Sequence, residues 1–485
     1  MSSRLGRART KTTRLYSFIF LFGVIYGQDN SNKSLDDILL DDNIDFAFDD
    51  SIFNSPFETE QESSKNDWLD NFTIKVSQQL YSQINHHRIP ITPTLSIDRK
   101  RDLEINRLGT NVRYQNVFAP GWLLQASAQL RLHWAGDYQS EVENKNFEWE
   151  FRGNELFLQR SFANQTIKLG RQTVVWGETL GNSVLDVINI NEFRDFSIID
   201  IEDARLNQWL LVWDFFGDDS DFSSFINFFP EFNPNPVRGS PFFFEMPFDL
   251  TEYDREGDLI FEVGTKWKRS FKGSDVSLMA AYLYENQLSF DVPSEAFKNP
   301  KPKVNDFVLF GFSVNRALGK LLLNLDIAYS HDVLLGSFNF LSNTSMNSGS
   351  SSKANRLGTS FGFEYAVNNN QNISIGIQAQ KLTNIDSTPF DNFSGNERKV
   401  FGSWLARYSN AFNNGNLTVS STLQGDLKGE SLLALMDVTY NLNDKWAIST
   451  QIISISAADN SPLFLFSEDV RLGATVSFSF LSLIQ

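Results

Sequence analysis

The connections between predicted strands most constrain the fold, because period-two segments are joined alternately by long polar stretches and by very short turns. A strand that crosses a bilayer needs about 9–11 residues and shows lipid on one side and the lumen on the other, so apolar and polar residues alternate. From Leu124 to Trp134 the apolar residues share one face, whereas polar residues from Gln125 to His133 share the other. A single soluble strand can also alternate. The length of the series therefore favours an all-β fold, a transmembrane antiparallel β-barrel.

This pattern predicts a barrel of about 18 strands, with 16 as the lower bound. Short turns of such barrels lie on the periplasmic side and long loops outside, so the first strand should run outward. The one short outer connection is 426–429. The candidate strands span 71–83, 104–117, 121–135, 147–161, 166–176, 207–216, 221–229, 258–270, 275–289, 304–315, 319–332, 356–367, 371–382, 399–411, 415–425, 430–441, 445–457 and 470–483.

The first 27 residues are typical of a secretory signal peptide. Five basic residues between Arg4 and Arg14 precede an apolar run over 15–26, which ends before Gly27. The run is too short for a membrane-spanning helix, although an uncleaved anchor is the alternative. We therefore expect export, cleavage near Gly27 and residence in the cell outer membrane.

An acidic segment over 28–68 separates the signal peptide from the barrel, which is predicted to occupy 69–485. Its residues Ser34 to Asp50 read SLDDILLDDNIDFAFDD. Apolar residues at helical spacing behind a Ser34/Asp37 capping pair fit one short amphipathic helix, which could dock a periplasmic partner or plug the lumen. A solvated, flexible tail is the other interpretation, because acidic stretches with few aromatic residues bury little apolar surface.

Charge and composition exclude several classes of function. The formal net charge is −17, and removal of 1–27 takes away five basic residues and no acidic ones, which leaves −22. Such a chain repels phosphates, so no nucleic-acid partner is expected. With no cysteine, the chain has no disulfide, no thiolate metal site and no cysteine nucleophile. The 45 phenylalanines suit aromatic girdles at the two membrane interfaces.

Residues suited to catalysis are scarce. Histidine, the usual general base, occurs only as His86, His87, His133 and His331. His331 directly follows Ser330, but neighbouring residues of a strand point to opposite faces, so the two should not pair. Acidic residues 218, 219 and 221 are interpreted as a solvated turn. We expect no enzyme, no cofactor, and no catalytic, cofactor-binding or metal site.

The last strand predicts how the barrel is assembled. Apolar residues from Leu472 to Phe480 alternate with small polar ones and with Gly473. This is similar to the C-terminal signal that barrel-assembly machinery recognises in its clients. The usual signal ends in an aromatic residue, whereas here 481–485 follow. An ordinary last strand is the alternative interpretation.

The block 167–192, IKLGRQTVVWGETLGNSVLDVININE, resembles a family of uncharacterised bacterial outer-membrane barrels related to alginate-export-type porins. In that family a strand ends in Gly-Arg-Gln, followed by Trp-Gly-Glu and an asparagine in a segment that dips into the barrel. This chain departs from the pattern at Ile190, where the family tends to have proline. The matching positions are Gly170, Arg171, Gln172, Trp176, Gly177, Glu178 and Asn189.

The same block has a physical interpretation. We place Arg171 in the middle of a strand, where a lipid-facing arginine is costly, so it should face the lumen. A carboxylate such as Glu178, or another from 178–206, could pair with it and hold an inward-folded loop that narrows the pore. Bracing of the wall is an equally good role for these residues. Arg131, Arg152, Arg160 and Arg205 are further candidates for this charged network.

The leading functional hypothesis is a monomeric barrel that passes or hands over a solute through a loop-constricted lumen. The resemblance implies a lipid-like or hydrophobic cargo and an inner-membrane exporter or other periplasmic partner. Outer-membrane lipids, and the assembly machinery during biogenesis, are the other expected partners. The alternative is a membrane-anchored adaptor whose acidic tail or outer loops bind a protein. A barrel-borne lipase or protease is a third hypothesis.

Overall fold

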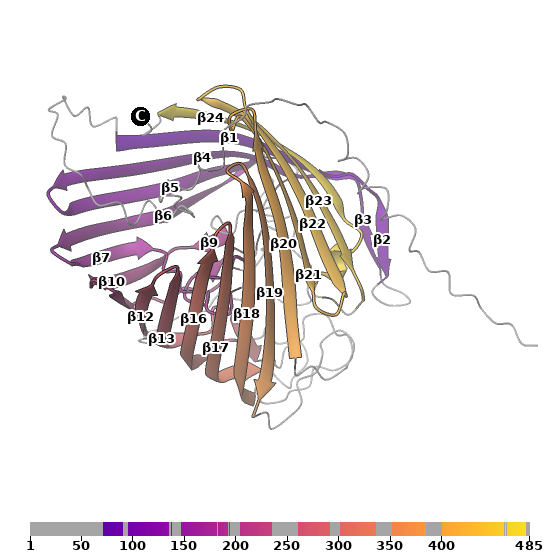
Figure 1. Ribbon diagram of the computed structural model, residues 1–485. Helices are drawn as coiled ribbons and strands as arrows, with labels where there is room; N and C mark the ends of the chain where they lie inside the picture. The colour runs from indigo at the N-terminus through magenta and orange to yellow at the C-terminus, as the bar shows by residue number, and fades with distance from the viewer. Residues whose placement is uncertain are drawn as a thin grey trace, which may run out of the picture. The chain divides into compact units, whose positions relative to one another are not determined.

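Eighteen strands form one antiparallel sheet in the computed structural model. Each strand pairs with its neighbour in the chain, and β1 also pairs with β24, which closes the ring (Figure 1). Closure leaves no free edge. The structure describes residues 71–90, 96–134, 137, 147–181, 183–192, 194, 204–234, 260–291, 301–335, 352–384, 400–459, 461 and 463–481. The predicted signal peptide, the acidic segment and the extreme C-terminus lie outside this part of the chain.

All eighteen predicted strands are confirmed, with ends shifted by a few residues. The barrel strands are β1 (Phe72–Gln83), β4 (Asp102–Ala119), β5 (Trp122–Trp134), β6 (Phe147–Phe162), β7 (Gln165–Gln172), β10 (Gln208–Phe216), β11 (Ser220–Asn227), β12 (Glu262–Phe271), β13 (Ser274–Tyr284), β16 (Asp306–Leu318), β17 (Leu321–Leu335), β18 (Ser352–Asn368), β19 (Gln371–Thr383), β20 (Val400–Phe412), β21 (Leu417–Asp426), β22 (Ser431–Asn441), β23 (Trp446–Ala457) and β24 (Val470–Leu481). The other elements are the strand pairs β2 (His87–Pro90) with β3 (Ser96–Arg99), β8 (Ile190–Asn191) with β9 (Arg205–Leu206) and β14 (Ser289–Asp291) with β15 (Lys301–Lys303), and the 3-10 helix η4 (Phe464–Phe466).

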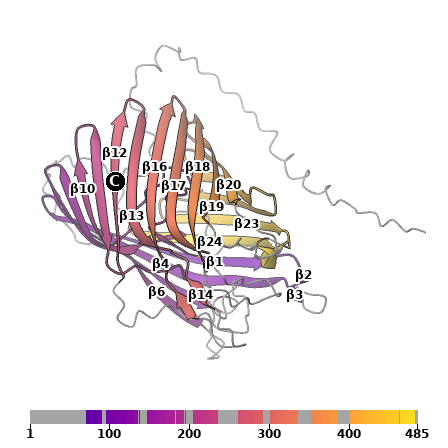
Figure 2. The ribbon, with the colours of Figure 1, turned by 90° about the horizontal axis from the view of Figure 1, so that it is seen from below.

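Short and long connections alternate as the sequence predicts. Two-residue turns join β12 to β13 and β16 to β17, and they contain Gly273 and Gly319 with φ of 72° and 61°. These backbone conformations suit glycine, which lacks the Cβ that clashes there. The next connections along the chain, 285–305 and 336–351, are long. Figure 2 shows strands β12, β13, β16 and β17 next to one another from a second viewpoint.

The outer face of the barrel is apolar. In β5, Leu130 and Trp134 are 39% and 36% exposed, whereas the alternate residues Gln125 and His133 are 3% exposed. In β19, Ile375 is likewise exposed on the outer face. This alternation around a closed ring is the arrangement of a transmembrane barrel of the outer membrane. In the described residues, no helix is long and apolar enough to cross a bilayer.

Buried apolar side chains gather inside the barrel in two clusters. One joins the connection after β7 to strands β10 to β19. The other includes Tyr81 and Ile105 and contacts Phe466 of the β23–β24 connection. Beside this second cluster, the fully buried Asp469 pairs with Arg99 at 2.7 Å and with Arg471 at 2.8 Å. The connection after β7 and the β23–β24 connection therefore both fold back against the inner face of the barrel, and their apolar side chains are buried there.

Candidate functional site

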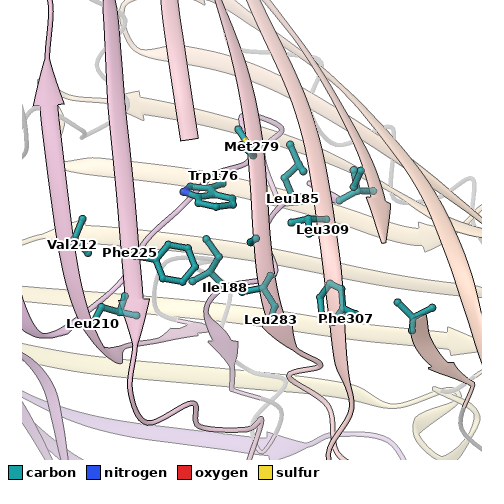
Figure 3. Close-up of a cluster of buried hydrophobic side chains, with 14 of the residues drawn as sticks. Trp176, Leu185, Ile188, Leu210, Val212, Phe225, Met279, Leu283, Phe307 and Leu309 are labelled. Carbon is teal, nitrogen blue, oxygen red and sulfur yellow. The ribbon is translucent and has the colours of Figure 1, made fainter. Parts of the chain in front are cut away.

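The connection that follows β7 lies against the inner wall of the barrel. We call residues 173–192 the constriction segment. Its side chains Trp176, Leu185 and Ile188 are at most 2% exposed. They pack against inward-facing residues of β10 to β19, among them Phe225 and Leu309 (Figure 3). The segment is therefore held to one side of the lumen by apolar burial, the dominant favourable term in packing.

Inward-facing glycines make room for the constriction segment. A Cβ added at Gly311 would lie 2.6 Å from Leu185 Cδ2, and one added at Gly358 would lie 2.9 Å from Val184 Cγ1. Real Cβ atoms do not approach other atoms so closely. Gly264 and Gly362 lie in the same way beneath Trp176 and Thr179. The wall is thus shaped to the segment, because a larger side chain at these positions would clash with it and disturb its packing.

One buried carboxylate anchors the start of the segment. Asp326 of β17 is 0% exposed and accepts hydrogen bonds from the backbone nitrogens of Glu178 and Thr179 at 3.2 and 3.0 Å. Ser183 Oγ donates to the same carboxylate at 2.7 Å, and Ser313 Oγ of β16 donates at 2.6 Å. Four donors compensate for the desolvation of the carboxylate, which would otherwise be costly.

Further polar contacts fix the rest of the segment. Val184 N donates to Ser360 Oγ at 3.1 Å, and Gln208 Nε2 donates to the Ile188 carbonyl at 2.6 Å. Asn189, which the sequence predicts in an inward segment, is 1% exposed. Its side chain accepts from Val174 N at 3.0 Å and donates to the Val174 carbonyl at 2.8 Å. The asparagine therefore closes a loop within the segment, and no proline is needed at Ile190 for this path.

A charged network joins the end of the segment to the inner wall at β5 and β6. Glu192 has a side chain that is 1% exposed, and it pairs with Arg152 at 2.6 Å and with Arg194 at 2.7 Å. Glu150 of β6 pairs with the same two arginines at 3.2 and 2.9 Å. Arginine suits such sharing, because its planar guanidinium offers donors to two carboxylates at once.

The network continues along β5 to β4. Arg131 lies 3.8 Å and His133 Nε2 3.7 Å from Glu150. Asp137 in turn lies 3.4 Å from His133 Nδ1 and 2.9 Å from Arg107. One side of the lumen therefore presents alternating arginines and carboxylates, opposite the side on which the segment packs through apolar residues. This side of the inner wall is therefore polar and charged.

The other residues predicted for the site lie inside the barrel but outside this charged network. Gln172 is 5% exposed and donates to the Leu210 carbonyl at 3.3 Å. Glu178 lies 3.6 Å from Lys266. Arg205 pairs with Asp186 at 2.7 Å, within the connection after β7. The structure therefore brings Arg131 and Arg152 into one network, while Glu178 and Arg205 pair elsewhere.

The prediction that Arg171 lies in mid-strand, faces the lumen and pairs with Glu178 or another carboxylate of 178–206 is wrong. β7 ends at Gln172, and Arg171 lies opposite Leu156 and Trp209. Both neighbours are exposed on the outer face, at 48% and 40%. Arg171 pairs instead with Glu231, with a second hydrogen bond of 2.8 Å. An outward arginine is tolerated because it lies at the strand end, with a bidentate carboxylate beside it.

Arg160 is a second correction, because it does not belong to the lumen. It lies opposite Trp122 and Ile167 near the short turn before β5. Its guanidinium lies 5.0 Å from the centre of the Trp122 ring, and Nη1 donates to the Pro120 carbonyl at 2.7 Å. This arrangement is typical of a residue at the membrane interface, where the charged group reaches water and the stem covers apolar surface.

Arg171→Ala is expected to leave the channel properties of the barrel unchanged. The Arg171–Glu231 pair is partly exposed and outside the lumen, so its loss should cost about 1 kcal/mol of stability at most. The measurement is single-channel conductance in a planar bilayer, together with the midpoint of thermal unfolding. A higher single-channel conductance in this variant would show that Arg171 does contribute to the constriction.

Ser330 and His331, the serine and histidine that are adjacent in the sequence, face opposite ways in the structure. Ser330 is 3% exposed and faces inward, whereas His331 is exposed and contacts Asn355 Oδ1 at 2.8 Å. The predicted opposite orientation of these two residues is confirmed. His133 belongs to the charged network, and His86 pairs with Asp98 at 2.7 Å beyond the barrel wall.

Sequence reasoning missed the residues that receive the segment. Asp326 and Ser360 lie in ordinary alternating stretches, where nothing marks them as anchors. One available signal was the series of glycines at inward positions, such as Gly358 and Gly362, where a strand ordinarily carries a side chain. Glycine in a strand often marks the close approach of another part of the chain.

Comparisons with known proteins give fold-level likeness only. OccAB1 of Acinetobacter baumannii is 10% identical with a TM-score of 0.48, over 87% of this chain and 99% of that chain. The outer membrane protein opdK of Pseudomonas aeruginosa is 9% identical with a TM-score of 0.45, over 85% and 99%. At these values neither likeness says what this chain does. No protein-family model and no curated protein matches the sequence, so the relation to alginate-export-type porins stays a prediction.

Proposed function

We propose that this barrel lets a small polar solute cross the outer membrane through a lumen narrowed by the constriction segment. The observation that supports this most is the burial of 173–192 against one side of the inner wall. The segment is anchored by Asp326 at one end and by the Glu192 network at the other. A constriction fixed at both ends can select solutes by size and charge, because its polar groups keep a set geometry.

A polar solute fits the described lumen better than the lipid-like cargo that the family resemblance implies. The apolar side chains of the segment, such as Trp176 and Leu185, are buried against the wall, so they offer no apolar surface to a solute. The side that remains carries Arg131, Arg152 and Glu150. A hydrophobic molecule gains nothing from such a surface, and it would take water away from charged groups at a cost.

The adaptor hypothesis depends on the acidic tail over 28–68 and on the outer loops, which lie largely outside the described residues. An inner-membrane exporter or another periplasmic partner is a proposal as well, and it depends on the same segments. Truncation of 28–68 separates the two functions. Intact conductance with loss of a co-purifying protein would favour the adaptor, and intact conductance with no lost partner would favour the solute channel.

Arg131→Gln is expected to shift ion selectivity several-fold toward cations. Arg131 faces the lumen but lies 3.8 Å from Glu150, so its removal takes away a positive charge without breaking the closer pairs of the network. The measurement is the reversal potential of the reconstituted protein under a salt gradient. The effect should weaken at high ionic strength, because salt screens the charge.

Arg160→Gln is the matched control for this measurement. It removes the same charge from the outer face, so the reversal potential should stay at the wild-type value. If Arg160→Gln and Arg131→Gln shift the potential equally, the selective surface does not lie along β5 and β6. If the wild-type barrel conducts no ions and passes no solute in liposomes, the proposed transport function is wrong.

A further inference from the structure

A buried carboxylate beneath the constriction segment is without a charged partner. Glu364 of β18 faces the lumen and is 6% exposed. Asn324 Nδ2 of β17 donates to it at 3.1 Å. No lysine, arginine or histidine of the described chain forms an ion pair with it. An isolated buried carboxylate is costly, so such a group calls for a proton, a water molecule or a cation.

Two buried side chains of the same region carry oxygen atoms without hydrogen-bond partners. Asn324 and Thr179 are 2% and 4% exposed, and neither Asn324 Oδ1 nor Thr179 Oγ1 has a partner among the described protein atoms. The two side chains are neighbours above Gly362, where an added Cβ would lie 3.2 Å from Asn324 Cβ and 3.2 Å from Thr179 Cγ2. The amide nitrogen of Asn324 contacts Glu364 directly, and Thr179 lies next to Asn324, so both side chains belong to the same part of the inner wall as the carboxylate.

A third acceptor comes from the next strand. In the register of β18 and β19, Glu364 lies opposite Ser374, and Ala366 lies opposite Asn372. Asn372 is thus the diagonal neighbour of Glu364 on the same inward face, a distance that long side chains span. Asn372 Oδ1 is buried and has no partner within the described chain either. Three orphaned oxygens therefore accompany one unpaired carboxylate.

We propose that these oxygens form a site for a hard monovalent cation, with Na⁺ as the ion. Hard cations take carboxylate, amide and hydroxyl oxygens as ligands, and one carboxylate balances one positive charge. No cluster of three or more His, Asp or Glu side chains in the described residues is arranged to hold a metal, which argues against a more highly charged ion. The site is independent of which solute crosses the barrel.

The cation would tie the constriction segment to the wall. Thr179 belongs to the segment, whereas Asn324, Glu364 and Asn372 belong to β17, β18 and β19. Thr179 N also donates to Asp326, so the ion would lie next to the anchor that already holds this part of the segment. Binding to the folded barrel alone stabilises it in proportion to the logarithm of ion concentration above the dissociation constant.

The test compares thermal unfolding of the detergent-solubilised full chain in sodium chloride and in choline chloride at equal concentration. The wild type should unfold several degrees higher in Na⁺, and the difference should grow with the logarithm of the Na⁺ concentration above the dissociation constant. Choline keeps the ionic strength constant but is too large for a cage of side-chain oxygens. Equal midpoints in the two salts would overturn the proposal and leave the site to water or to a protonated Glu364.

Thr179→Val is the decisive variant. Without an ion, loss of a hydroxyl that has no protein partner should cost nothing and could stabilise the barrel. With the ion, the variant should lose most of the Na⁺-dependent rise in the unfolding midpoint. Retention of the full wild-type rise would overturn the proposal.

Glu364→Gln should abolish the rise altogether, and Thr422→Val is the matched control. Thr422 is a buried inward threonine of β21, away from the site, so its variant should keep the whole rise in Na⁺. If Glu364→Gln fails to fold, the comparison of Thr179→Val with Thr422→Val still decides. An equal loss of Na⁺ dependence in those two variants would show a general effect of salt and contradict the site.

Discussion

Asp326→Ala should conduct several-fold more current per channel than the wild type. The substitution removes the acceptor for four donors, two of them backbone nitrogens of the constriction segment. Each buried donor left without a partner costs about 1–3 kcal/mol. The first half of the segment should therefore lose its fixed position, and a mobile segment no longer holds the lumen narrow. Single-channel recording in a planar bilayer measures the effect.

Asp437→Ala is the matched control for this experiment. Asp437 of β22 also faces the lumen, where it accepts a hydrogen bond from Thr439 Oγ1 at 2.9 Å. Its strand lies outside β10 to β19, the part of the wall against which the segment packs. Its removal takes away the same charge and should leave the conductance near the wild-type value. Equal conductance of Asp326→Ala and the wild type would mean that the segment does not depend on this anchor.

Trp176→Ala should have the second-largest effect. Trp176 is 2% exposed and packs edge-on against Phe225, with ring centres 5.4 Å apart. Truncation of a buried aromatic side chain costs about 3–5 kcal/mol, because a cavity replaces its contacts. The contacts that are lost are those that hold the segment against the wall. We therefore expect a single-channel current that fluctuates more and has a higher mean than in the wild type. Hydrogen exchange should show loss of protection in 173–192.

The control for Trp176→Ala is Trp209→Ala. Trp209 of β10 is 40% exposed on the outer face, so its truncation removes an aromatic side chain without a cavity in the lumen. Protection of 173–192 should then stay at the wild-type level. If both variants lose protection in that segment to the same extent, the segment is sensitive to general destabilisation of the barrel, and packing by Trp176 is not what holds it.

The strands could be predicted because the physics that forms them is local. Lipid on one side and lumen on the other impose alternation along each strand, so Leu130 and His133 reveal their faces without any knowledge of the neighbouring strands. The turns follow from residues such as Gly273 and Gly319, whose positive φ is also a local property. Because the number of strands is even, the last strand runs antiparallel to the first. β24 can therefore pair with β1 in the same way as all other neighbours and close the ring.

The orientation of Arg171 could not be predicted in the same way. The rule that arginine avoids lipid holds in mid-strand, but β7 ends at Gln172, several residues earlier than the pattern indicates. The partner, Glu231, comes from the connection after β11 and is 60 residues away. The anchors of the segment pose the same problem, because Asp326 lies 147 residues from Thr179. Alternation fixes the face of a residue and does not say what it meets there.

The central claim, that the constriction segment narrows the lumen, can be tested by a reversible tether. The chain has no cysteine, so the pair Val184→Cys and Gly358→Cys would be the only thiols. Val184 Cβ lies 3.1 Å from the position of a Cβ at residue 358. Disulfides have Cβ atoms about 3.5–4.5 Å apart, so a small shift would admit the bond.

The measurement is single-channel conductance of Asp326→Ala that also carries this cysteine pair, first oxidised and then exposed to a reductant in the same bilayer. We expect low conductance, close to the wild type, while the disulfide holds the segment to β18. Reduction should then raise it to the level of Asp326→Ala alone. Conductance that is the same before and after reduction, with the disulfide shown to have formed, would contradict the assignment of 173–192 as the constriction.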